Sequence, residues 1–251
     1  MADREDDLDP EEGGEQVVKQ GPVAVLSQVE KTYQLDAIKV PVIKGVNILV
    51  RHACFTVLLG PSGSGKTTLL NMIGCIDRPE QGTVTVAGCD VGSLDDDALS
   101  DFRAETIGFI FQNFNLIPVL TAYENAEQVL SLQGVPERER KARVLQLLEE
   151  VGLKGLENRR PHELSGGQQQ RVAIARAIAS RPAIVLADEP TANVDSETAE
   201  KLLALMARLN KDSGVTFLFS THDPRVMKYA RRLIGLVDGK VDSDVRKEEG
   251  A

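Results

Sequence analysis

The sequence predicts an α/β fold built on a mixed, mostly parallel β-sheet. Three short apolar runs, residues 55–59, 184–187 and 215–219, show no alternation with polar residues. Strands of this kind suit a parallel sheet that is covered on both faces, because neither face then meets water. Helical patterns lie between the three runs, and strand–helix alternation indicates α/β architecture.

The remaining strands are shorter and lie in the first half of the chain. Residues 23–30, 48–50 and 83–87 have strand patterns near the start, and we expect them to form a separate antiparallel sheet. A further strand is expected over residues 107–111. The fold is therefore expected to combine a central sheet with a smaller β-subdomain.

Helices are expected at several places between these strands. One follows a glycine-rich turn and covers residues 66–75. Another covers residues 136–151, with proline in its first turn and leucines at helical spacing. A third covers residues 196–210, where Asp195 can serve as the N-cap.

Charge divides the 251-residue chain into a folded domain and two tails. The chain has 29 basic and 38 acidic residues, a net charge of −9, and residues 1–16 hold eight of the acids and one base. We expect an acidic disordered tail over residues 1–20, one domain over residues 21–240 and a charged C-terminal tail over residues 241–251. A solubilising role is the simpler interpretation of the acidic tail, and docking is the alternative.

Several classes of protein are excluded by composition. No run approaches the roughly 18–20 apolar residues that span a bilayer, and the acidic start does not match a signal peptide. Cys54, Cys75 and Cys89 match no zinc or redox spacing, which is typical of reduced thiols in the cytosol. The net charge of −9 argues against a nucleic-acid partner.

The strongest local signal lies between the strand at residues 55–59 and the helix at residues 66–75. It matches the phosphate-loop pattern G-x-x-x-x-G-K-S/T and consists of Gly60, Pro61, Ser62, Gly63, Ser64, Gly65, Lys66, Thr67 and Thr68. Glycines let backbone N–H groups converge on phosphate oxygens, and the helix N-terminus adds positive potential. The pattern predicts that Lys66 reaches the β- and γ-phosphates and that the Thr67 hydroxyl ligates Mg²⁺.

A second acidic pair follows the apolar run at residues 184–187. Asp188 and Glu189 would lie at the carboxyl end of a parallel strand, which is where ligands bind in such sheets. Asp188 is expected to hold Mg²⁺, and Glu189 to orient or deprotonate an attacking water. Alone, the pair could equally be a strand that happens to end in acids; the phosphate loop favours the functional interpretation.

A third signal is a helix start rich in glycine. Ser165 and Gln168 form an S-x-x-Q capping box, and Gly166 and Gly167 leave the first amides open to a close ligand. From physical chemistry alone an ordinary capped helix is favoured over an anion site.

The segment from Leu164 to Gln168 reads LSGGQ. Together with the phosphate loop and residues 184–189, it resembles the ATPase subunit of ATP-binding-cassette (ABC) transporters over roughly residues 23–238. The resemblance implies a P-loop NTPase fold with an N-terminal antiparallel β-subdomain and an α-helical subdomain inserted at about residues 113–165. It also implies that ATP and Mg²⁺ are the ligands.

Further positions match the family one by one. Tyr33 resembles the aromatic residue that stacks on adenine, and His222 resembles the histidine that contacts the γ-phosphate. Gln112 resembles the glutamine that senses Mg²⁺ and couples to the membrane subunit. Asp195 ends a segment similar to the loop that crosses the dimer interface. The resemblance thus implies catalytic roles for Lys66, Gln112, Glu189 and His222, metal contacts for Thr67, Gln112 and Asp188, and ATP contacts in trans for Ser165, Gly166, Gly167 and Gln168.

The family also implies partners that the sequence does not encode. Two copies are expected to bind two ATP molecules between them and to drive a separate membrane-spanning permease. The chain itself is expected to be peripheral, at the cytoplasmic face of the inner membrane. Segments 73–79, 108–118 and 191–195 are similar to those of lipoprotein-releasing and macrolide-exporter ATPases. A related ATPase that regulates cell division without transport is the alternative. Residues 51–54 and Ala192 depart from the family pattern, but neither departure removes a charge or a ligand.

Overall fold

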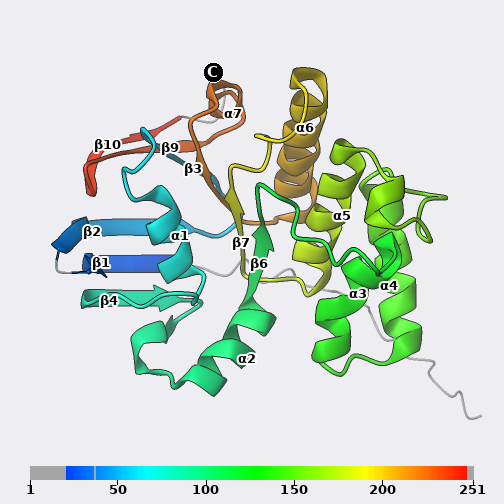
Figure 1. Cartoon of the computed structure of the whole chain (residues 1–251), viewed down its shortest axis with the longest axis horizontal. Coiled ribbons are helices and arrows are strands. Elements are labelled where there is room, and N and C mark those ends of the chain that lie inside the picture. The colour runs from blue at the N-terminus through cyan, green and yellow to red at the C-terminus, as the bar shows by residue number, and fades with distance from the viewer. Residues whose placement is uncertain (1–20, 37, 248–251) are drawn as a thin grey trace, which may run out of the picture.

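The computed structural model describes residues 21–36 and 38–247. The acidic tail expected over residues 1–20 lies outside this part of the chain. No helix in the part described is long and apolar enough to cross a membrane. Two β-sheets and a group of helices make up the fold, with the antiparallel sheet and the helical subdomain at opposite sides of the central sheet (Figure 1).

The antiparallel sheet is built from the N-terminal part of the chain. Its four strands lie in the order β2-β1-β4-β5 and are β1 (Pro22–Leu35), β2 (Ile38–Arg51), β4 (Gln81–Val86) and β5 (Cys89–Asp90). All its pairs are antiparallel, which confirms the expected β-subdomain. The β1 and β2 strands run considerably longer than the sequence predicted.

The central sheet has six strands in the order β10-β9-β3-β8-β7-β6. They are β3 (Phe55–Leu59), β6 (Ile107–Ile110), β7 (Ile184–Asp188), β8 (Phe217–Thr221), β9 (Arg232–Val237) and β10 (Lys240–Arg246). The first five of these strands in chain order are parallel where they pair, and β10 joins β9 antiparallel. The carboxyl ends of β3, β7 and β8 therefore meet at one edge, where ligands bind in such folds.

The helices cover both faces of the central sheet. They are α1 (Lys66–Ile73), α2 (Asp96–Thr106), α3 (Ala122–Leu132), α4 (Glu137–Glu150), α5 (Gly166–Ala179), α6 (Ser196–Ser213) and α7 (Pro224–Met227), with short 3₁₀ turns at Val91–Ser93 and Pro161–Glu163. Asp195 caps α6 by accepting from two backbone amides, as predicted. Pro136 is the N-cap of α4 and not part of its first turn.

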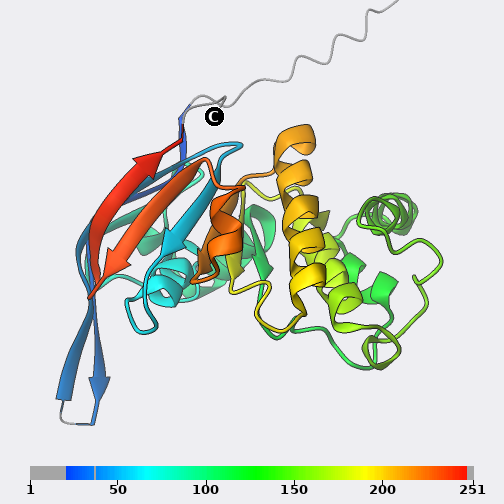
Figure 2. The same ribbon diagram turned by 90° about the horizontal axis from the view of Figure 1, so that it is seen from above.

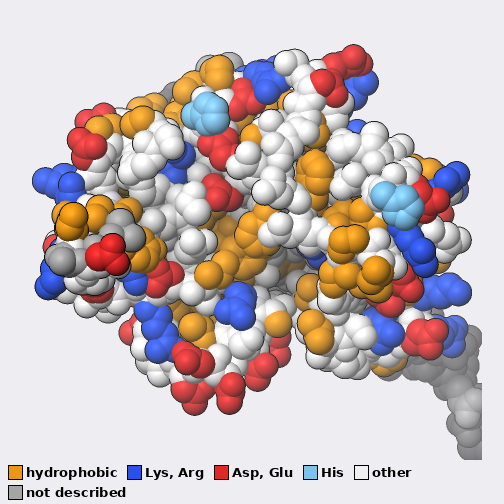
Figure 3. All heavy atoms as spheres, in the orientation of Figure 1, with side chains coloured by type: hydrophobic (Ala, Val, Ile, Leu, Met, Phe, Trp, Pro, Cys, Tyr) orange, Lys and Arg blue, Asp and Glu red, His pale blue; other side chains and the backbone are white. Residues whose placement is uncertain are grey.

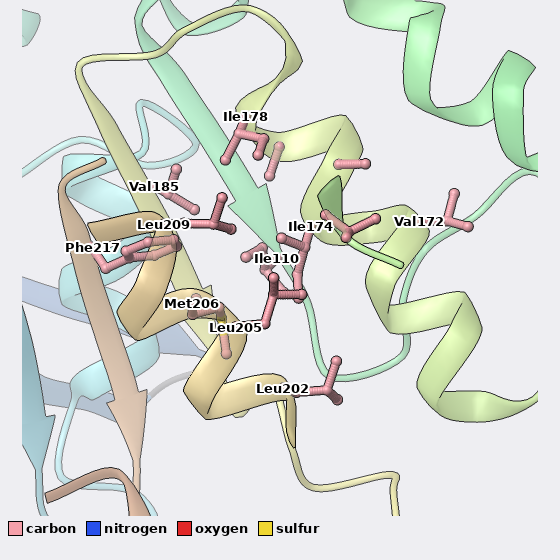
Figure 4. Close-up of a cluster of buried hydrophobic side chains, with 14 of the residues drawn as sticks. Ile110, Val172, Ile174, Ile178, Val185, Leu202, Leu205, Met206, Leu209 and Phe217 are labelled. Carbon is pink, nitrogen blue, oxygen red and sulfur yellow. The ribbon is translucent and has the colours of Figure 1, made fainter. Parts of the chain in front are cut away.

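Two apolar cores lie on opposite faces of the central sheet. Phe217 and Phe219 of β8 face the core beneath α3 to α6, and Leu218 faces the core beneath α1 and the antiparallel sheet. Figure 4 shows the first of these cores, where side chains of α5 and α6 meet those of β6, β7 and β8. Burial on both faces explains why the central strands show no alternation of polar and apolar residues.

The prediction that residues 241–251 form a charged tail is wrong for residues 241–246, which belong to β10. Arg232 of β9, nearly buried, donates from Nε and Nη2 to the carboxylate of Asp244 at 2.7 and 2.6 Å. Val241 packs against the core, and most other side chains of β10 are exposed. An edge strand tolerates such charge because one side pairs with nothing, so its composition resembles that of a tail.

Candidate functional site

The phosphate loop connects β3 to α1 in a conformation that only glycine tolerates easily. Gly63 and Gly65 have φ angles of +77° and +102°. A Cβ on Gly65 would lie 2.6 Å from Ile43 Cδ1. Gly65 is the N-cap of α1 and offers no side-chain acceptor, so the first amides of the helix are not capped by it. The N-terminus of α1 is therefore open to an anion.

Lys66 is 7% exposed and lies within the loop that it follows. Its Nζ donates to the carbonyl oxygens of Gly60 at 2.8 Å and Pro61 at 2.9 Å. These are neutral acceptors, and a phosphate would offer the ammonium a charged one. Lys66 is thus held at the loop and can exchange its partners for phosphate oxygens.

A cavity of about 500 Å³ opens beside the loop. It is lined by Val42, Ser62, Gly63, Gly65, Lys66, Thr67, Thr68, Gln112, Asp188, Glu189, Ala192, Ser220 and His222. The structure therefore brings together all six residues that were predicted to be catalytic or to hold the metal. Two buried hydroxyls, Ser64 Oγ of the phosphate loop and Ser220 Oγ of the cavity wall, have no hydrogen-bond partner in the part of the chain that the structure describes.

Thr67 and Asp188 form the part of the cavity suited to a divalent cation. The Thr67 hydroxyl donates to Asp188 Oδ2 at 3.0 Å and lies 3.3 Å from Oδ1, although the residues are 121 positions apart. A hydroxyl and a carboxylate are oxygen ligands of the kind that Mg²⁺ prefers, with water and phosphates completing its shell. The donor set therefore fits the predicted ion.

Glu189 adopts a left-handed backbone conformation, with φ of +46°. Its backbone N–H donates to Ser220 O at 2.8 Å, and its Oε2 accepts from Thr221 Oγ1 at 3.0 Å. Oε1 lies 2.8 Å from His222 Nδ1. The side chain of Glu189 is 19% exposed, while that of His222 is 74% exposed. The carboxylate is thus fixed on one side by β8 and faces the cavity on the other.

Sequence reasoning missed the two residues of β8 that support Glu189. Ser220 and Thr221 directly precede His222 at the carboxyl end of a strand parallel to β7, and Asp188 pairs with Ser220. Their place at the end of a predicted parallel strand could have identified them, because residues at the carboxyl ends of neighbouring parallel strands meet at one edge of the sheet. The signal is weak, since short polar residues also end many strands that bind no ligand.

Gln112 lies in the segment after β6 and lines the same cavity. Its backbone carbonyl accepts from Asn193 Nδ2 at 3.0 Å, and the same amide group donates to Asn113 Oδ1 at 2.7 Å. The buried Gln170 of α5 donates to Pro190 O at 2.5 Å and, more weakly, to Phe111 O at 3.5 Å. The segments that carry Gln112 and Glu189 are thus tied together, and Gln170 was not predicted.

Some residues that were predicted to contact ATP do not line the cavity: Gly60, Pro61 and Ser64 of the phosphate loop, and, farther along the chain, Tyr33, Ser165, Gly166, Gly167, Gln168 and Asp195. Tyr33 lies in β1, and its hydroxyl donates to Asp77 Oδ2 at 2.6 Å. Ser165 to Gln168 begin α5 with both hydrogen bonds of the predicted capping box. Asp195 caps α6 and accepts from Thr198 Oγ1 at 2.5 Å, a hydrogen bond that lowers the pKa of its carboxyl. Their contacts to nucleotide stay predictions.

The two glycines of this helix start differ in their surroundings. A Cβ on Gly167 would lie 2.4 Å from Thr198 Cγ2, so close packing of α5 on α6 is itself a reason for glycine there. A Cβ on Gly166 would have only ordinary contacts, the nearest at 3.6 Å from Asn193 O. The packing of this chain therefore does not itself require glycine at position 166.

Comparison with known proteins agrees with this geometry. A family model described as "ABC transporter" matches residues 43–192. The chain belongs to the ABC transporter family. The lipoprotein-releasing system ATP-binding protein LolD of Anaeromyxobacter dehalogenans is 47% identical over 224 residues, which cover 89% of this chain and 94% of that protein. The macrolide export ATP-binding/permease protein MacB of Syntrophobacter fumaroxidans is 45% identical, and the match covers 87% of this chain and 31% of MacB.

A solved structure confirms the cassette fold. The ATP-binding cassette MJ0796 of Methanocaldococcus jannaschii, described as a dimer in a post-hydrolysis state with ADP and Pi, has a TM-score of 0.82 and 44% identity to this chain. The match covers 89% of this chain and 98% of that one. This chain is thus an ATP-binding ABC cassette with ATPase function, similar to the lipoprotein-releasing and macrolide-exporter group.

Proposed function

We propose that two copies of this chain hydrolyse Mg²⁺-bound ATP and drive a separate membrane-spanning permease. The two copies would lie at the cytoplasmic face of the inner membrane as peripheral subunits. The observation that carries the catalytic part is the convergence of Lys66, Thr67, Asp188, Glu189 and His222 on one cavity at the carboxyl edge of the central sheet. The similarity to LolD and MacB supports the permease part and a role in lipoprotein release or export.

Each side chain at the cavity has a role that its contacts support. Lys66 would neutralise β- and γ-phosphate charge, and Thr67 and Asp188 would hold Mg²⁺, which shields the phosphates when bound. Glu189 would accept a hydrogen bond from the attacking water and take its proton. His222, hydrogen-bonded to Glu189 Oε1, would keep that carboxylate in place and contact the γ-phosphate.

Ser165, Gly166, Gly167 and Gln168 would contact the nucleotide of the partner copy. They lie at the N-terminus of α5, outside the cavity of their own chain, and Gly166 and Gly167 place no side chain over the first turn. A helix N-terminus binds phosphate through its free amides and its dipole. ATP would then lie between two copies, consistent with the dimeric form described for MJ0796.

The segment between β6 and α3 is the surface proposed to meet the permease. Val119 is 72% exposed, and Figure 3 shows hydrophobic side chains on this face over that segment. Exposed apolar groups of this kind mark interaction surfaces when they gather. The segment also contains Gln112, so a partner bound here would contact the loop that reaches the nucleotide.

The substitution Glu189→Gln tests the catalytic proposal. We expect ATP turnover to fall by about 10²–10⁴-fold, the range for loss of a general base, while ATP binding persists. Glu197→Gln on the exposed face of α6 is the matched control and should leave turnover unchanged. Undiminished turnover in Glu189→Gln would refute the role of this carboxylate.

The permease proposal is tested by purification from native membranes. We expect the tagged chain to retain a membrane-spanning partner in mild detergent, and Val119→Asp to release it. Arg138→Asp, on an exposed face of α4, is the control and should retain the partner. Recovery of the chain without any membrane protein would contradict the permease proposal while leaving the catalytic one untouched.

A further inference from the structure

A cluster of four arginines lies where α4 ends against α5 and α6, away from the nucleotide cavity. We call Arg143, Arg171, Arg181 and Arg208 the arginine cluster. Arg143 and Arg181 line a pocket of about 360 Å³ together with Gly214 and Val215. Burial and the nearby charge of Arg181 lower the pKa of Arg143, and burial and the charge of Arg208 lower that of Arg171. The four guanidinium groups therefore form two like-charge pairs.

No carboxylate in residues 21–36 or 38–247 forms an ion pair with any arginine of the cluster. Arg171 Nη1 donates to Val151 O at 2.6 Å, and Arg208 Nη2 donates to Glu150 O at 2.8 Å; both acceptors are neutral carbonyls at the end of α4. Arg143 Nη2 is buried and has no hydrogen-bond partner within residues 21–36 and 38–247. Glu150 is the one acid among the residues that line the pocket.

Such a cluster is costly without a counter-charge. Like charges repel, and a buried guanidinium nitrogen without an acceptor loses its hydration without compensation. The folded part of the chain is nearly balanced in charge, because residues 1–16 hold eight of the 38 acids and only one of the 29 bases. An acidic segment from elsewhere in the chain would supply counter-charge that Glu150 alone does not.

The described part of the chain begins close to this cluster. Pro22, at the start of β1, pairs with Arg51 at the end of β2. In the turn that follows, the backbone N–H of Ala53 donates to Thr216 Oγ1 at 3.0 Å, and Ala53 O accepts from Asn210 Nδ2 at 3.1 Å. The same Asn210 amide donates to Val215 O, which belongs to the pocket wall. Figure 2 shows the start of β1 and the last turn of α6 at the same edge of the molecule.

Residues 3–15 precede this point and are strongly acidic. They include eight acids and one base, and the acids are Asp3, Glu5, Asp6, Asp7, Asp9, Glu11, Glu12 and Glu15. Glu15, seven residues before Pro22, is the acid nearest to it and therefore has the shortest reach. If the chain between them is extended, Glu15 can still lie about 23–25 Å from Pro22. Tethering also raises the effective concentration of these carboxylates to about the millimolar range.

From the orphaned guanidinium, the position of Pro22 and the opposite charges, we infer that the acidic segment of residues 3–15 binds the arginine cluster of its own chain. Its carboxylates supply the negative charge that the pocket lined by Arg143 and Arg181 lacks. Because Arg143 belongs to α4 of the helical subdomain and the pocket wall includes the end of α6, the bound segment bridges the helical subdomain and the central domain.

Zero-length cross-linking of the full chain tests this inference. In an Arg181→Lys variant, a water-soluble carbodiimide joins the new amine to a carboxyl group through an amide bond, with loss of water. We expect peptides from residues 3–15 joined to position 181 in a product of monomer mass. The joined peptides should be lost at 1 M NaCl, where the Debye length is about 3 Å. The control Arg138→Lys, on an exposed face at the other end of α4, should join none.

A second measurement does not depend on a new lysine. In the full chain with its eight acids at residues 3–15 changed to Asn or Gln, the ¹⁵N–¹H resonances of Gly214 and Val215 should shift, while those of the phosphate loop should not. Unchanged resonances at both positions would overturn the inference. So would a cross-linked product of twice the monomer mass, which would place the segment on a second copy.

Discussion

Glu189 illustrates how a single residue can be held in a costly conformation for its chemistry. Its φ of +46° lies in a region that costs a residue with a side chain about 1–3 kcal/mol. The backbone hydrogen bond to Ser220 and the side-chain contacts to Thr221 and His222 oppose that cost. All three contacts come from β8 or from the residue directly after it. The orientation of the Glu189 carboxylate therefore depends on the pairing of β7 with β8.

Gly63 and Gly65 allow strain to be separated from steric contact in the phosphate loop. Both have positive φ, but a Cβ on Gly63 would meet nothing within 4 Å, whereas one on Gly65 would press on Ile43 and Val42. We expect Gly63→Ala to lower the free energy of unfolding by about 1–2 kcal/mol, and Gly65→Ala to lower it by about 1–3 kcal/mol more. Urea denaturation measures both values; equal losses would show that contact with β2 does not matter.

The pair of Asp77 and Lys31 predicts an acid-dependent part of stability. Burial pushes the pKa of Asp77 up, but hydrogen bonds from Lys31 at 2.5 Å and Tyr33 at 2.6 Å outweigh it, so the pKa is lowered. A carboxyl with a lowered pKa stabilises the fold above its unfolded pKa, about 3.9, and this contribution is lost as pH falls through the folded pKa. We expect Asp77→Asn to cost about 1–2 kcal/mol at pH 7, and the difference from the unsubstituted chain to shrink below about pH 4.

Denaturation between pH 2.5 and 7 measures this dependence, with Asp101→Asn on the exposed face of α2 as the control. A difference that stays constant over this range would contradict the assignment.

Tyr33 has the opposite pH dependence. Burial and the hydrogen bond to Asp77 raise the pKa of its hydroxyl. Its contribution to the stability of the fold is therefore present below about pH 10 and is lost as pH rises through the raised pKa.

At the scale of elements, α5 connects the glycine-rich helix start to the nucleotide cavity. Arg176 donates to Asn115 O at 2.5 Å and to Phe114 O at 2.9 Å. Phe114 and Asn115 have φ angles of +60° and +48°, so α5 holds a strained part of the segment that contains Gln112. Gln170, on the same helix, reaches Pro190. Movement of α5 would therefore move the groups on both sides of the cavity together.

Gln170 is the buried link whose removal tests this connection. In Gln170→Leu the carbonyl of Pro190 loses its donor inside the protein, which costs about 1–3 kcal/mol. We expect that loss of stability together with slower ATP turnover and little change in nucleotide binding. Gln146→Leu, at an exposed position on α4, is the matched control and should change stability by less than about 0.5 kcal/mol. Reduced stability with normal turnover would restrict Gln170 to a structural role.

The elements differ in how far their sequence predicts them. Residues 217–219 indicate a buried strand because both of its faces are apolar, but nothing in the run tells that Phe217 and Leu218 belong to different cores. The phosphate loop and Asp188 could be predicted because their chemistry demands particular residue types. Gln170 and Thr221 could not, since an amide or a hydroxyl gains its role only from neighbours far away in the chain. The β10 strand was missed for the same reason, because the charge of its Asp244 is matched by Arg232 of β9, a partner that the local sequence does not reveal.

At the scale of the whole molecule, the groups proposed to bind one nucleotide lie in two separate places. One chain places the phosphate loop, Asp188, Glu189 and His222 on one cavity, while the start of α5 lies outside it. Within the part of the chain that the structure describes, Ser165 and Gln168 satisfy each other as a capping box and form no hydrogen bond with these groups. Two copies related by a twofold axis would bring each α5 start to the other copy's cavity, and two identical sites would result.

A mixture of two inactive variants tests this arrangement. Lys66→Ala disables the phosphate loop, and Gly166→Asp places a negative charge at the start of α5, where a Cβ has room and the capping box is kept. Each variant alone should be inactive. In the mixed dimer, the intact loop of one copy faces the intact α5 start of the other, so an equal mixture should recover about a quarter of normal activity if one site suffices.

The matched control for that mixture combines Lys66→Ala with Glu189→Gln. Both changes affect groups that line the same cavity of one chain, so each of the two sites in the mixed dimer carries one of them and activity should stay lost. Recovery in the first mixture but not in the control requires that the α5 start acts on the partner's nucleotide while Glu189 acts on its own. Absence of recovery in the first mixture, with dimers present by light scattering, would place both groups on the nucleotide of a single chain.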